Sequence, residues 1–392
     1  MDGLATATGE VTDAFERSSR DAGKPNPRTK VKDMTPPDIN HDSRPRRFRL
    51  PAAVAALALA GVVAALPAYA SGGGKVSGVR AAVKHGTLNV TGSDGGQQVA
   101  LRLKAGDPNT IQVDAGNNGS ADFSFATGDV DAIKVKLGDG NDLARIDDSN
   151  GSFTGGARPT TISGGGGNDT LLGAQNPPAG GPDNQVETYK GGDGNDTIDG
   201  GRGNDTAYLG GGNDTFRWDP GEGNDTIEGQ EGSDTMLFNG AGVNEQVTLS
   251  DVGGRLQFFR APGAVTMLTN DVEIVDFNAL GGSDTVQEAN DGDLTGTDVT
   301  QINLDLASAL GGIAPDAAAD TVDVNGTNGV DNIDVQGNGS GADVTGLAPA
   351  VSVKHADAAN SATPDHLTVN TRAGADNVVQ NVGNQIQLTV NN

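Results

Sequence analysis

Residues 191–216 read GGDGNDTIDGGRGNDTAYLGGGNDTF, in which the unit G-x-G-N-D-T occurs three times at intervals of nine residues. Each copy places an aspartate among glycines and follows it with an apolar or small residue; these aspartates are Asp196, Asp205 and Asp214. Like charges at a fixed interval repel one another when the chain folds. The repeat therefore restricts the chain to folds in which positive charge neutralises a row of carboxylates.

The repeat extends over residues 161–240, a block with 14 acidic and only three basic side chains. Its acidic positions follow one another at intervals of 18, 9, 9, 9, 11 and 9 residues: Asp169, Glu187, Asp196, Asp205, Asp214, Asp225 and Asp234. The first interval contains AQNPPAGGPDNQ, and the interval of 11 contains two extra residues near Trp218. Because basic side chains are so few, we expect the compensating charge to come from bound cations.

The unit can be written G-G-x-G-N-D-T-U-x, with U an apolar or small residue. Glycine adopts positive φ without penalty, so the first six residues can turn tightly, and the last three form a short strand with U pointing inward. Two units make an 18-residue coil, and coils stack about 4.8 Å apart. Turn oxygens of consecutive coils can then bind one Ca²⁺ between them. The predicted core positions are Leu171, Tyr189, Ile198, Ala207, Phe216, Ile227 and Met236.

The units GGDGNDTID and GGRGNDTAY resemble the nonapeptide of the RTX, or hemolysin-type, calcium-binding repeat family. This resemblance implies a parallel β-roll that binds Ca²⁺ through carboxylate and carbonyl oxygens of turns two repeats apart. The carboxylate pairs it implies are Asp169 with Asp196, Glu187 with Asp205, Asp196 with Asp214, Asp205 with Asp225, and Asp214 with Asp234. Two departures leave individual sites open: Glu187 lacks the usual glycines, and the insertion before Asp225 lengthens one turn.

One other interpretation of these aspartates is that each only caps a turn. Asp also favours ordinary turns, but five copies of Gly-Asn-Asp-Thr in register favour the metal. Single turns with weaker similarity contain Asp142, Asp284, Asp331 and Asp376. Since these four aspartates lack stacked partners with complete glycine sets, we do not expect them to bind Ca²⁺ as the aspartates of the block do.

The segments on both sides of the block alternate apolar and polar residues in short runs, such as TLNVTG at 87–92 and QIQLTV at 385–390, which indicates strands. The sequence therefore predicts an all-β solenoid: a parallel β-roll or β-helix at 161–240, an N-terminal β segment at 71–160 and a C-terminal β-rich segment at 241–392. With 60 glycines, 14 aromatic residues and a net charge of −26, the alternative is disorder. The same charge argues against a nucleic-acid partner.

Residues 1–70 are interpreted as a disordered extension followed by a signal peptide. A basic stretch at 43–50 precedes 20 mostly apolar residues that end in Ala68-Tyr69-Ala70, which matches an A-x-A cleavage site. An uncleaved membrane anchor is the alternative. Arg46-Arg47 leaves the export route open between Sec and twin-arginine, and Met34 is a second candidate start. We expect a secreted protein, without membrane attachment after cleavage and, lacking cysteine, without disulfides.

Local motifs of catalysis are missing from the sequence, which contains neither HExxH nor G-x-S-x-G. His85, His355 and His366 are expected at the surface without partners, and residues 257–268 (QFFRAPGAVTML) are expected in the core. The favoured hypothesis is a non-enzymatic calcium-binding protein with a structural or interaction role, whose partner is a cell-surface polysaccharide or protein. The alternative is a calcium-dependent polysaccharide-modifying β-helix enzyme, which needs a groove lined by carboxylates with Arg or Lys.

Overall fold

The structure is a computed structural model that describes residues 78–154, 158–175, 186–289 and 293–392. The chain divides into two units, residues 1–65 and 66–392, and all described residues belong to the second. The proposed signal peptide with its cleavage site lies outside the described residues. Within the described ranges, no helix has the length and apolar character needed to cross a membrane.

The described residues form two 14-stranded sheets and contain no α-helix, only two short 3-10 turns, η1 (Thr127–Asp129) and η2 (Pro262–Ala264). In spatial order, sheet A consists of β1 (Arg80–Lys84), β2 (Thr87–Thr91), β6 (Ala132–Asp139), β8 (Thr160–Gly166), β10 (Glu187–Asp193), β12 (Thr206–Gly212), β14 (Thr226–Gly232), β18 (Val265–Asn270), β17 (Arg255–Arg260), β16 (Gln246–Val252), β20 (Thr285–Glu288), β22 (Thr321–Asn325), β26 (His366–Asn370) and β28 (Gln387–Asn391).

Sheet B follows the same direction through the stack. Its strands, in spatial order, are β5 (Phe123–Ala126), β4 (Asp107–Ala115), β3 (Gln98–Lys104), β7 (Leu143–Asp147), β9 (Thr170–Ala174), β11 (Thr197–Gly201), β13 (Thr215–Trp218), β15 (Thr235–Asn239), β19 (Ile274–Asn278), β21 (Gln301–Asp305), β25 (Ala350–Lys354), β24 (Ala342–Thr345), β23 (Asn332–Gly337) and β27 (Asn377–Asn381).

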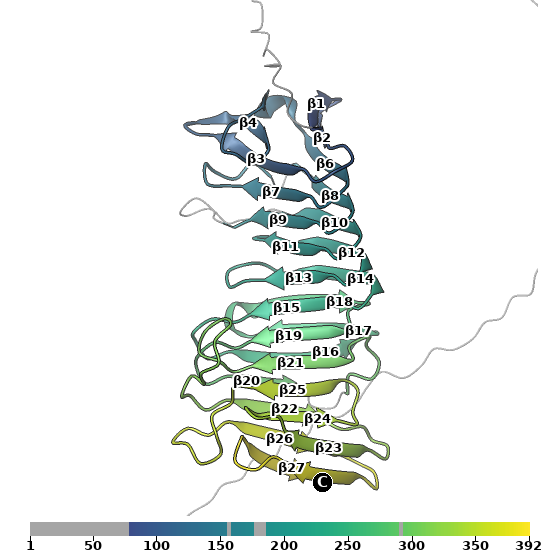
Figure 1. The fold of residues 1–392 in the computed structure, drawn as a ribbon, viewed down its shortest axis with the longest axis vertical. Helices are drawn as coiled ribbons and strands as arrows, with labels where there is room; N and C mark the ends of the chain where they lie inside the picture. The colour runs from purple at the N-terminus through teal and green to yellow at the C-terminus, as the bar shows by residue number, and fades with distance from the viewer. Residues whose placement is uncertain (1–77, 155–157, 176–185, 290–292) are drawn as a thin grey trace, which may run out of the picture. The chain divides into compact units, whose positions relative to one another are not determined.

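From β6 to β15 the chain alternates between the sheets, so that each coil adds one strand to each (Figure 1). Neighbouring strands of this region are parallel and in register; for example, Thr188 of β10 pairs with Thr206 of β12, and Ile198 of β11 pairs with Phe216 of β13. The predicted parallel β-roll is therefore confirmed, and the same stacking continues on both sides of the repeat block.

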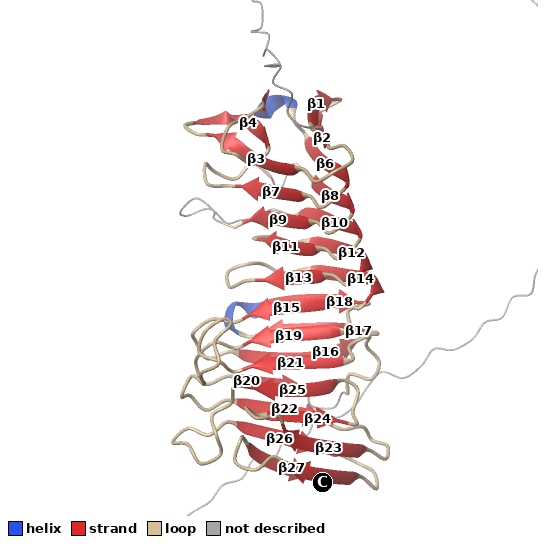
Figure 2. Cartoon of the chain, in the orientation of Figure 1, coloured by secondary structure: helices blue, strands red, loops and turns tan. Residues whose placement is uncertain are grey.

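Four groups of antiparallel strands accompany the parallel ones: two lie at the N-terminal ends of the sheets (Figure 2), and two lie within them. They are β1 against β2, the β3–β4–β5 meander, β16 with β17 and β18, and β24 between β23 and β25. Tight glycine turns form some of these hairpins: Gly253 and Gly254, with φ of 67° and 86°, connect β16 to β17. A Gly-Gly pair between two alternating runs is a hairpin signal.

One continuous core lies between the sheets, and all seven predicted U positions are fully buried in it. In the flanking segments a typical strand points two apolar side chains inward, as Val322 and Val324 do in β22. In β8, β9, β10, β11 and β14 the second inward position is a glycine: Gly164, Gly173, Gly191, Gly200 and Gly229. The apolar core is therefore thin at these five strands, whereas β12, β13 and β15 of the block place Leu209, Trp218 and Phe238 at that position.

Residues 257–268, expected in the core, contribute the buried side chains of Phe258 and Met267. Phe258 belongs to an aromatic group in which Trp218 stacks on Phe238 at a centroid distance of 4.1 Å and Phe238 contacts Phe258 at 4.4 Å. The expected core role of this segment is confirmed.

Candidate metal site

The acidic residues of the repeat lie at two edges of the roll, because successive nonapeptides turn at opposite edges. One row, the AB row, lies where the chain passes from sheet A to sheet B, and the other, the BA row, lies where it returns. The AB row contains Asp142, Asp169, Asp196, Asp214 and Asp234, and the BA row contains Glu187, Asp205 and Asp225. All eight side chains are buried, with at most 3% of their surface exposed.

A hydrogen-bond ladder joins the carboxylates within each row. The backbone N–H of Asp196 donates to Oδ1 of Asp214 at 2.7 Å, and that of Asp169 donates to Oδ1 of Asp196 at the same distance. The remaining bonds of this kind are Asp214 to Asp234, Glu187 to Asp205 and Asp205 to Asp225, at 2.7–2.9 Å. These are the five pairs implied by the resemblance, and the structure brings each pair together.

The second oxygen of these aspartates has no hydrogen-bond partner although it is buried. This holds for Oδ2 of Asp142, Asp169, Asp196, Asp205, Asp214, Asp225 and Asp234. A buried acceptor without a partner costs about 1–3 kcal/mol, and more when it is charged. Carboxylate and backbone carbonyl oxygens are the ligands that Ca²⁺ prefers. The orphaned oxygens therefore fit a row of bound Ca²⁺ ions.

The electrostatic environment of the rows favours uptake of positive charge. Burial raises the pKa of Asp169 to about 6 and those of Asp196, Asp225 and Asp234 to about 7. Burial also raises the pKa of Asp205, with further increases from the charges of Glu187 and Asp225. In each case the carboxylate is desolvated beside other acidic groups, so the ionised row requires a counter-charge.

Two positions of the turn require glycine because a side chain there would meet neighbouring atoms. Gly192 has a φ of 124°, and a Cβ there would overlap the carbonyl oxygen of Gly165 in the preceding coil. A Cβ on Gly191 would overlap Oδ2 of Asp196. Glycine therefore lets the coils approach and lets the carboxylate fold back against its own turn.

A second ladder, which sequence reasoning missed, involves the asparagine that precedes the aspartate. The backbone N–H of Asn195 donates to Oδ1 of Asn168, and that of Asn213 donates to Oδ1 of Asn195, both at 2.9 Å. The signal for it was present, because Asn stands before Asp in all five Gly-Asn-Asp-Thr copies. The asparagines thus satisfy backbone donors at the exposed side of the turn.

The two departures from the repeat do not break the ladder. Glu187 occupies the same place as the aspartates, since its backbone N–H donates to Oδ1 of Asp205. The insertion before Asp225 forms a bulge in which Oε2 of Glu222 accepts the N–H of Asp219, and the indole of Trp218 donates to the carbonyl of Gly223. Asp205 and Asp225 remain joined at 2.7 Å across it.

The expectation that Asp142 lacks a stacked partner is wrong. Its backbone N–H donates to Oδ1 of Asp169 at 2.8 Å, and its own Oδ1 accepts the N–H of Gln97 at 2.6 Å. Asp142 therefore starts the AB row. It was missed because Thr160 stands in this 27-residue interval at the position that Glu187 holds in the equally long interval from Asp169 to Asp196.

Asp284 also belongs to a row, formed in the C-terminal segment by Glu245, Asp284, Asp320 and Asp365. Backbone N–H groups donate along it at 2.7–2.8 Å, in the pattern of the repeat block. Glu245 is neutralised internally, since Arg260 donates to both of its carboxylate oxygens at 2.5 and 2.7 Å. Asp331 and Asp376 form a separate pair at 3.0 Å. Intervals of 36–45 residues hide these contacts from local sequence reasoning.

The histidines differ in part from expectation. His85 is exposed, and His366 is half-buried in β26. His355, which was expected to lack a partner, lies with Nδ1 2.7 Å from Oδ1 of Asp305. The neighbouring strands β21 and β25 bring these two residues together, although 50 positions separate them in sequence.

One further acidic cluster lies beside the insertion. Carboxylate oxygens of Asp199, Asp219 and Glu222 lie within 4.8 Å of one another. Arg217 forms ion pairs with both Asp199 and Asp219, so the protein itself supplies part of the compensating charge.

Two shallow grooves on the outer faces bear on the enzyme alternative. One is lined by Ser163, Lys190, Tyr208, Gln230 and three glycines, and the other by residues of β21, β24 and β25 that include Asp343. Neither combines carboxylates with Arg or Lys. These two grooves therefore do not provide the site that a polysaccharide-modifying enzyme needs.

Comparison with known proteins identifies the repeat. The family model of the RTX calcium-binding nonapeptide repeat matches residues 148–175, 183–216 and 221–240, in four copies. No curated protein matches the chain, and no solved structure does. The matched residues include every member of the AB and BA rows except Asp142. Residues 148–240 of this β-roll protein are therefore RTX, or hemolysin-type, calcium-binding repeats.

Proposed function

We propose that the two edge rows of the repeat block bind Ca²⁺ and that this binding folds the block. The ligands would be Asp169, Glu187, Asp196, Asp205, Asp214, Asp225 and Asp234, with glycine carbonyls of the same turns. The observation that carries the proposal is the set of buried Oδ2 atoms without partners. Asp142, which stacks on Asp169, joins this set.

The protein is proposed to act outside the cell as a non-enzymatic structural or interaction protein. Support comes from the signal-like residues 43–70 and from the RTX repeats. Cytosolic Ca²⁺ is low, so the block would stay unfolded until export and fold at extracellular concentrations. Its partner class is proposed to be a cell-surface polysaccharide or protein. The residue ranges 1–70, 71–160, 161–240 and 241–392 remain the proposed organisation.

A calcium titration of chelated protein, followed by circular dichroism, tests the proposal. The β signal should rise cooperatively with Ca²⁺, because binding free energy becomes folding free energy. Mg²⁺ at the same concentration is the matched control, since it binds all-protein oxygen cages poorly. A spectrum that Ca²⁺ leaves unchanged would refute the proposal.

A further inference from the structure

The outer face of sheet A carries a row of unpaired cations in a protein of net charge −26. Strand register aligns Arg80, Thr91, Lys136, Ser163, Lys190 and Tyr208 across six consecutive strands, from β1 to β12. Three of these six residues are cationic, and all three are exposed. Lys134 and Lys84 are exposed on the same face. We call these five cations with Tyr208 the basic face.

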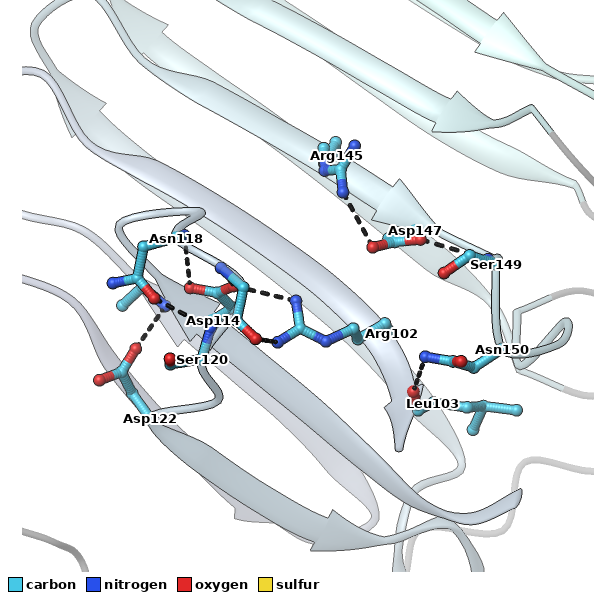
Figure 3. Close-up of polar contacts among 12 residues, drawn as sticks. Arg102, Leu103, Asp114, Asn118, Ser120, Asp122, Arg145, Asp147, Ser149 and Asn150 are labelled. Atoms are coloured by element: carbon cyan, nitrogen blue, oxygen red, sulfur yellow. Dashed lines mark hydrogen bonds and ion pairs between the residues drawn. The ribbon is translucent and has the colours of Figure 1, made fainter. Parts of the chain in front are cut away.

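The cations of the basic face differ from the other basic residues of the N-terminal segment. On sheet B, Arg102 donates to Asp114 and Arg145 donates to Asp147, as Figure 3 shows. Among the described residues, no ion pair involves Arg80, Lys84, Lys134, Lys136 or Lys190. In a strongly acidic protein, cations that remain unpaired and gather on one face offer a binding surface for anions.

The spacing of the row sets the shape of its ligand. Adjacent strands lie about 4.8 Å apart, so Arg80, Lys136 and Lys190, on alternate strands, are separated by about 10 Å each. Because the residues are paired in register, the row runs across the strands. It therefore suits a linear polymer whose acidic groups recur at that interval or at half of it.

Neutral polar groups and a groove accompany the cations. A second aligned row contains Asn89, Lys134, Thr161, Thr188 and Thr206, whose hydroxyl and amide groups can bond to hydroxyls of a ligand. Beside Lys190 and Tyr208 lies a groove of about 390 Å³, floored by Gly165, Gly192 and Gly210. Tyr208 is 39% exposed, with Lys190 Nζ 5.6 Å from its ring centroid.

From these observations we infer that the basic face binds a linear acidic polysaccharide that lies across the strands from β1 to β12. The inference deepens the proposed function by naming the partner. It rests on that function because it assumes that Ca²⁺ occupies the AB row. Asp139 and Asp193 at the strand ends would repel the ligand less once Ca²⁺ occupies the adjacent AB row. Single-stranded nucleic acid fits less well, because it requires several stacking aromatics and this face has only Tyr208.

Binding of chondroitin sulfate to the full chain in saturating Ca²⁺ tests the inference, with dextran as the neutral control. The double variant Lys136→Gln/Lys190→Gln removes two cations of the row. Lys104→Gln/Lys354→Gln removes the same charge from sheet B and is the matched control. The first pair should weaken chondroitin sulfate binding about tenfold, and the second pair less than twofold.

Three results would overturn the inference: no binding of chondroitin sulfate, equal losses in both double variants, or tighter binding of oligo-dT or poly-glutamate than of chondroitin sulfate. Calorimetric Ca²⁺ binding, measured on the same variants, should be unchanged. The calorimetry separates calcium binding from polysaccharide binding. Absence of Ca²⁺ binding would refute the proposed function, whereas the polysaccharide inference is judged by the difference between the two lysine pairs.

Discussion

Strands β10 and β22 show how the repeat block and its flanks reach the same fold differently. Strand β22 points Val322 and Val324 into the core, whereas β10 points Tyr189 and Gly191 inward. Burial of a Val or Leu side chain contributes about 1.5–3 kcal/mol, so each glycine at such a position weakens its coil by a similar amount. At these positions the repeat block has glycine in place of an apolar side chain, and under the proposed function the cations in the carboxylate rows supply the missing stability.

Glu245 and Asp214 make the same comparison at the level of single side chains. Each lies in a carboxylate row, but Glu245 is bound by the guanidinium of Arg260, while Oδ2 of Asp214 is buried without a partner. One carboxylate is neutralised from within the chain, and we expect the other to be neutralised from solution.

The largest effect is expected from Arg260→Gln, which leaves Glu245 buried without its partner. Breaking a buried ion pair costs about 3–5 kcal/mol, and the loss should be the same with and without Ca²⁺. Urea unfolding measures it. Arg255→Gln is the control, because its pair with Glu228 is partly exposed and should cost less than about 1 kcal/mol. If Ca²⁺ restored the stability of Arg260→Gln, the prediction would be contradicted, because a bound cation could then replace the guanidinium beside Glu245.

Next in size is Gly192→Ala in the repeat block. Its φ of 124° strains any other residue, and the new Cβ would overlap the carbonyl of Gly165, so a loss of about 2–3 kcal/mol is expected. Gly211→Ala is the matched control, since the nearest atom to its Cβ lies 4.0 Å away. Thermal unfolding in saturating Ca²⁺ compares the two. Equal stability would mean that the coils can separate without cost.

A smaller effect is expected from Asp196→Asn, which keeps the shape of the side chain and removes one charge from the AB row. The midpoint of the calcium titration should rise about tenfold, which corresponds to a loss of about 1.4 kcal/mol. Asp193→Asn, an exposed residue of the same turn, should change it less than twofold. Equal midpoints would show that the buried row is not where Ca²⁺ acts.

A further effect concerns pH. Burial raises the pKa of Asp169, Asp196 and Asp234 from the usual 3.8 to about 6–7. The folded, calcium-free state therefore binds more protons than the unfolded state between pH 4 and 7. Chelated protein should become more stable as pH falls from 8 to 5, and the gain should disappear in saturating Ca²⁺. Stability in chelator that falls over this range would contradict the assignment.

Features that depend on residues close together in the sequence could be predicted, whereas contacts between distant residues could not. The inward positions of the block followed from its nine-residue period, and all seven are buried. The strands of both flanks followed from period-two alternation. The stacking of Asp142 on Asp169 did not, because the contact depends on where a loop of variable length returns the chain. The row of Glu245, Asp284, Asp320 and Asp365 was hidden for the same reason.

The antiparallel strands were missed for a different reason. Alternation identifies a strand but not the direction of its neighbour, and β16 and β17 read like any other pair of strands in this chain. Gly253-Gly254 between them was the available signal. The pairing of Arg260 with Glu245 follows from that hairpin, so the internal cation could not be recognised without it.

Hydrogen–deuterium exchange of the protein in Ca²⁺ and in chelator tests the central claim most directly. The repeat block should depend on cations far more than β16–β28 does, because in the described part of that segment Asp284 is the one aspartate with a buried carboxylate oxygen that lacks a partner. In Ca²⁺, amides of β8–β15 and of β16–β28 should both be protected. In chelator, protection should be lost in β8–β15, whose inward positions include Gly164, Gly191 and Gly229, and largely retained in β16–β28. Equal protection of the two regions in chelator, whether kept or lost in both, would contradict the account.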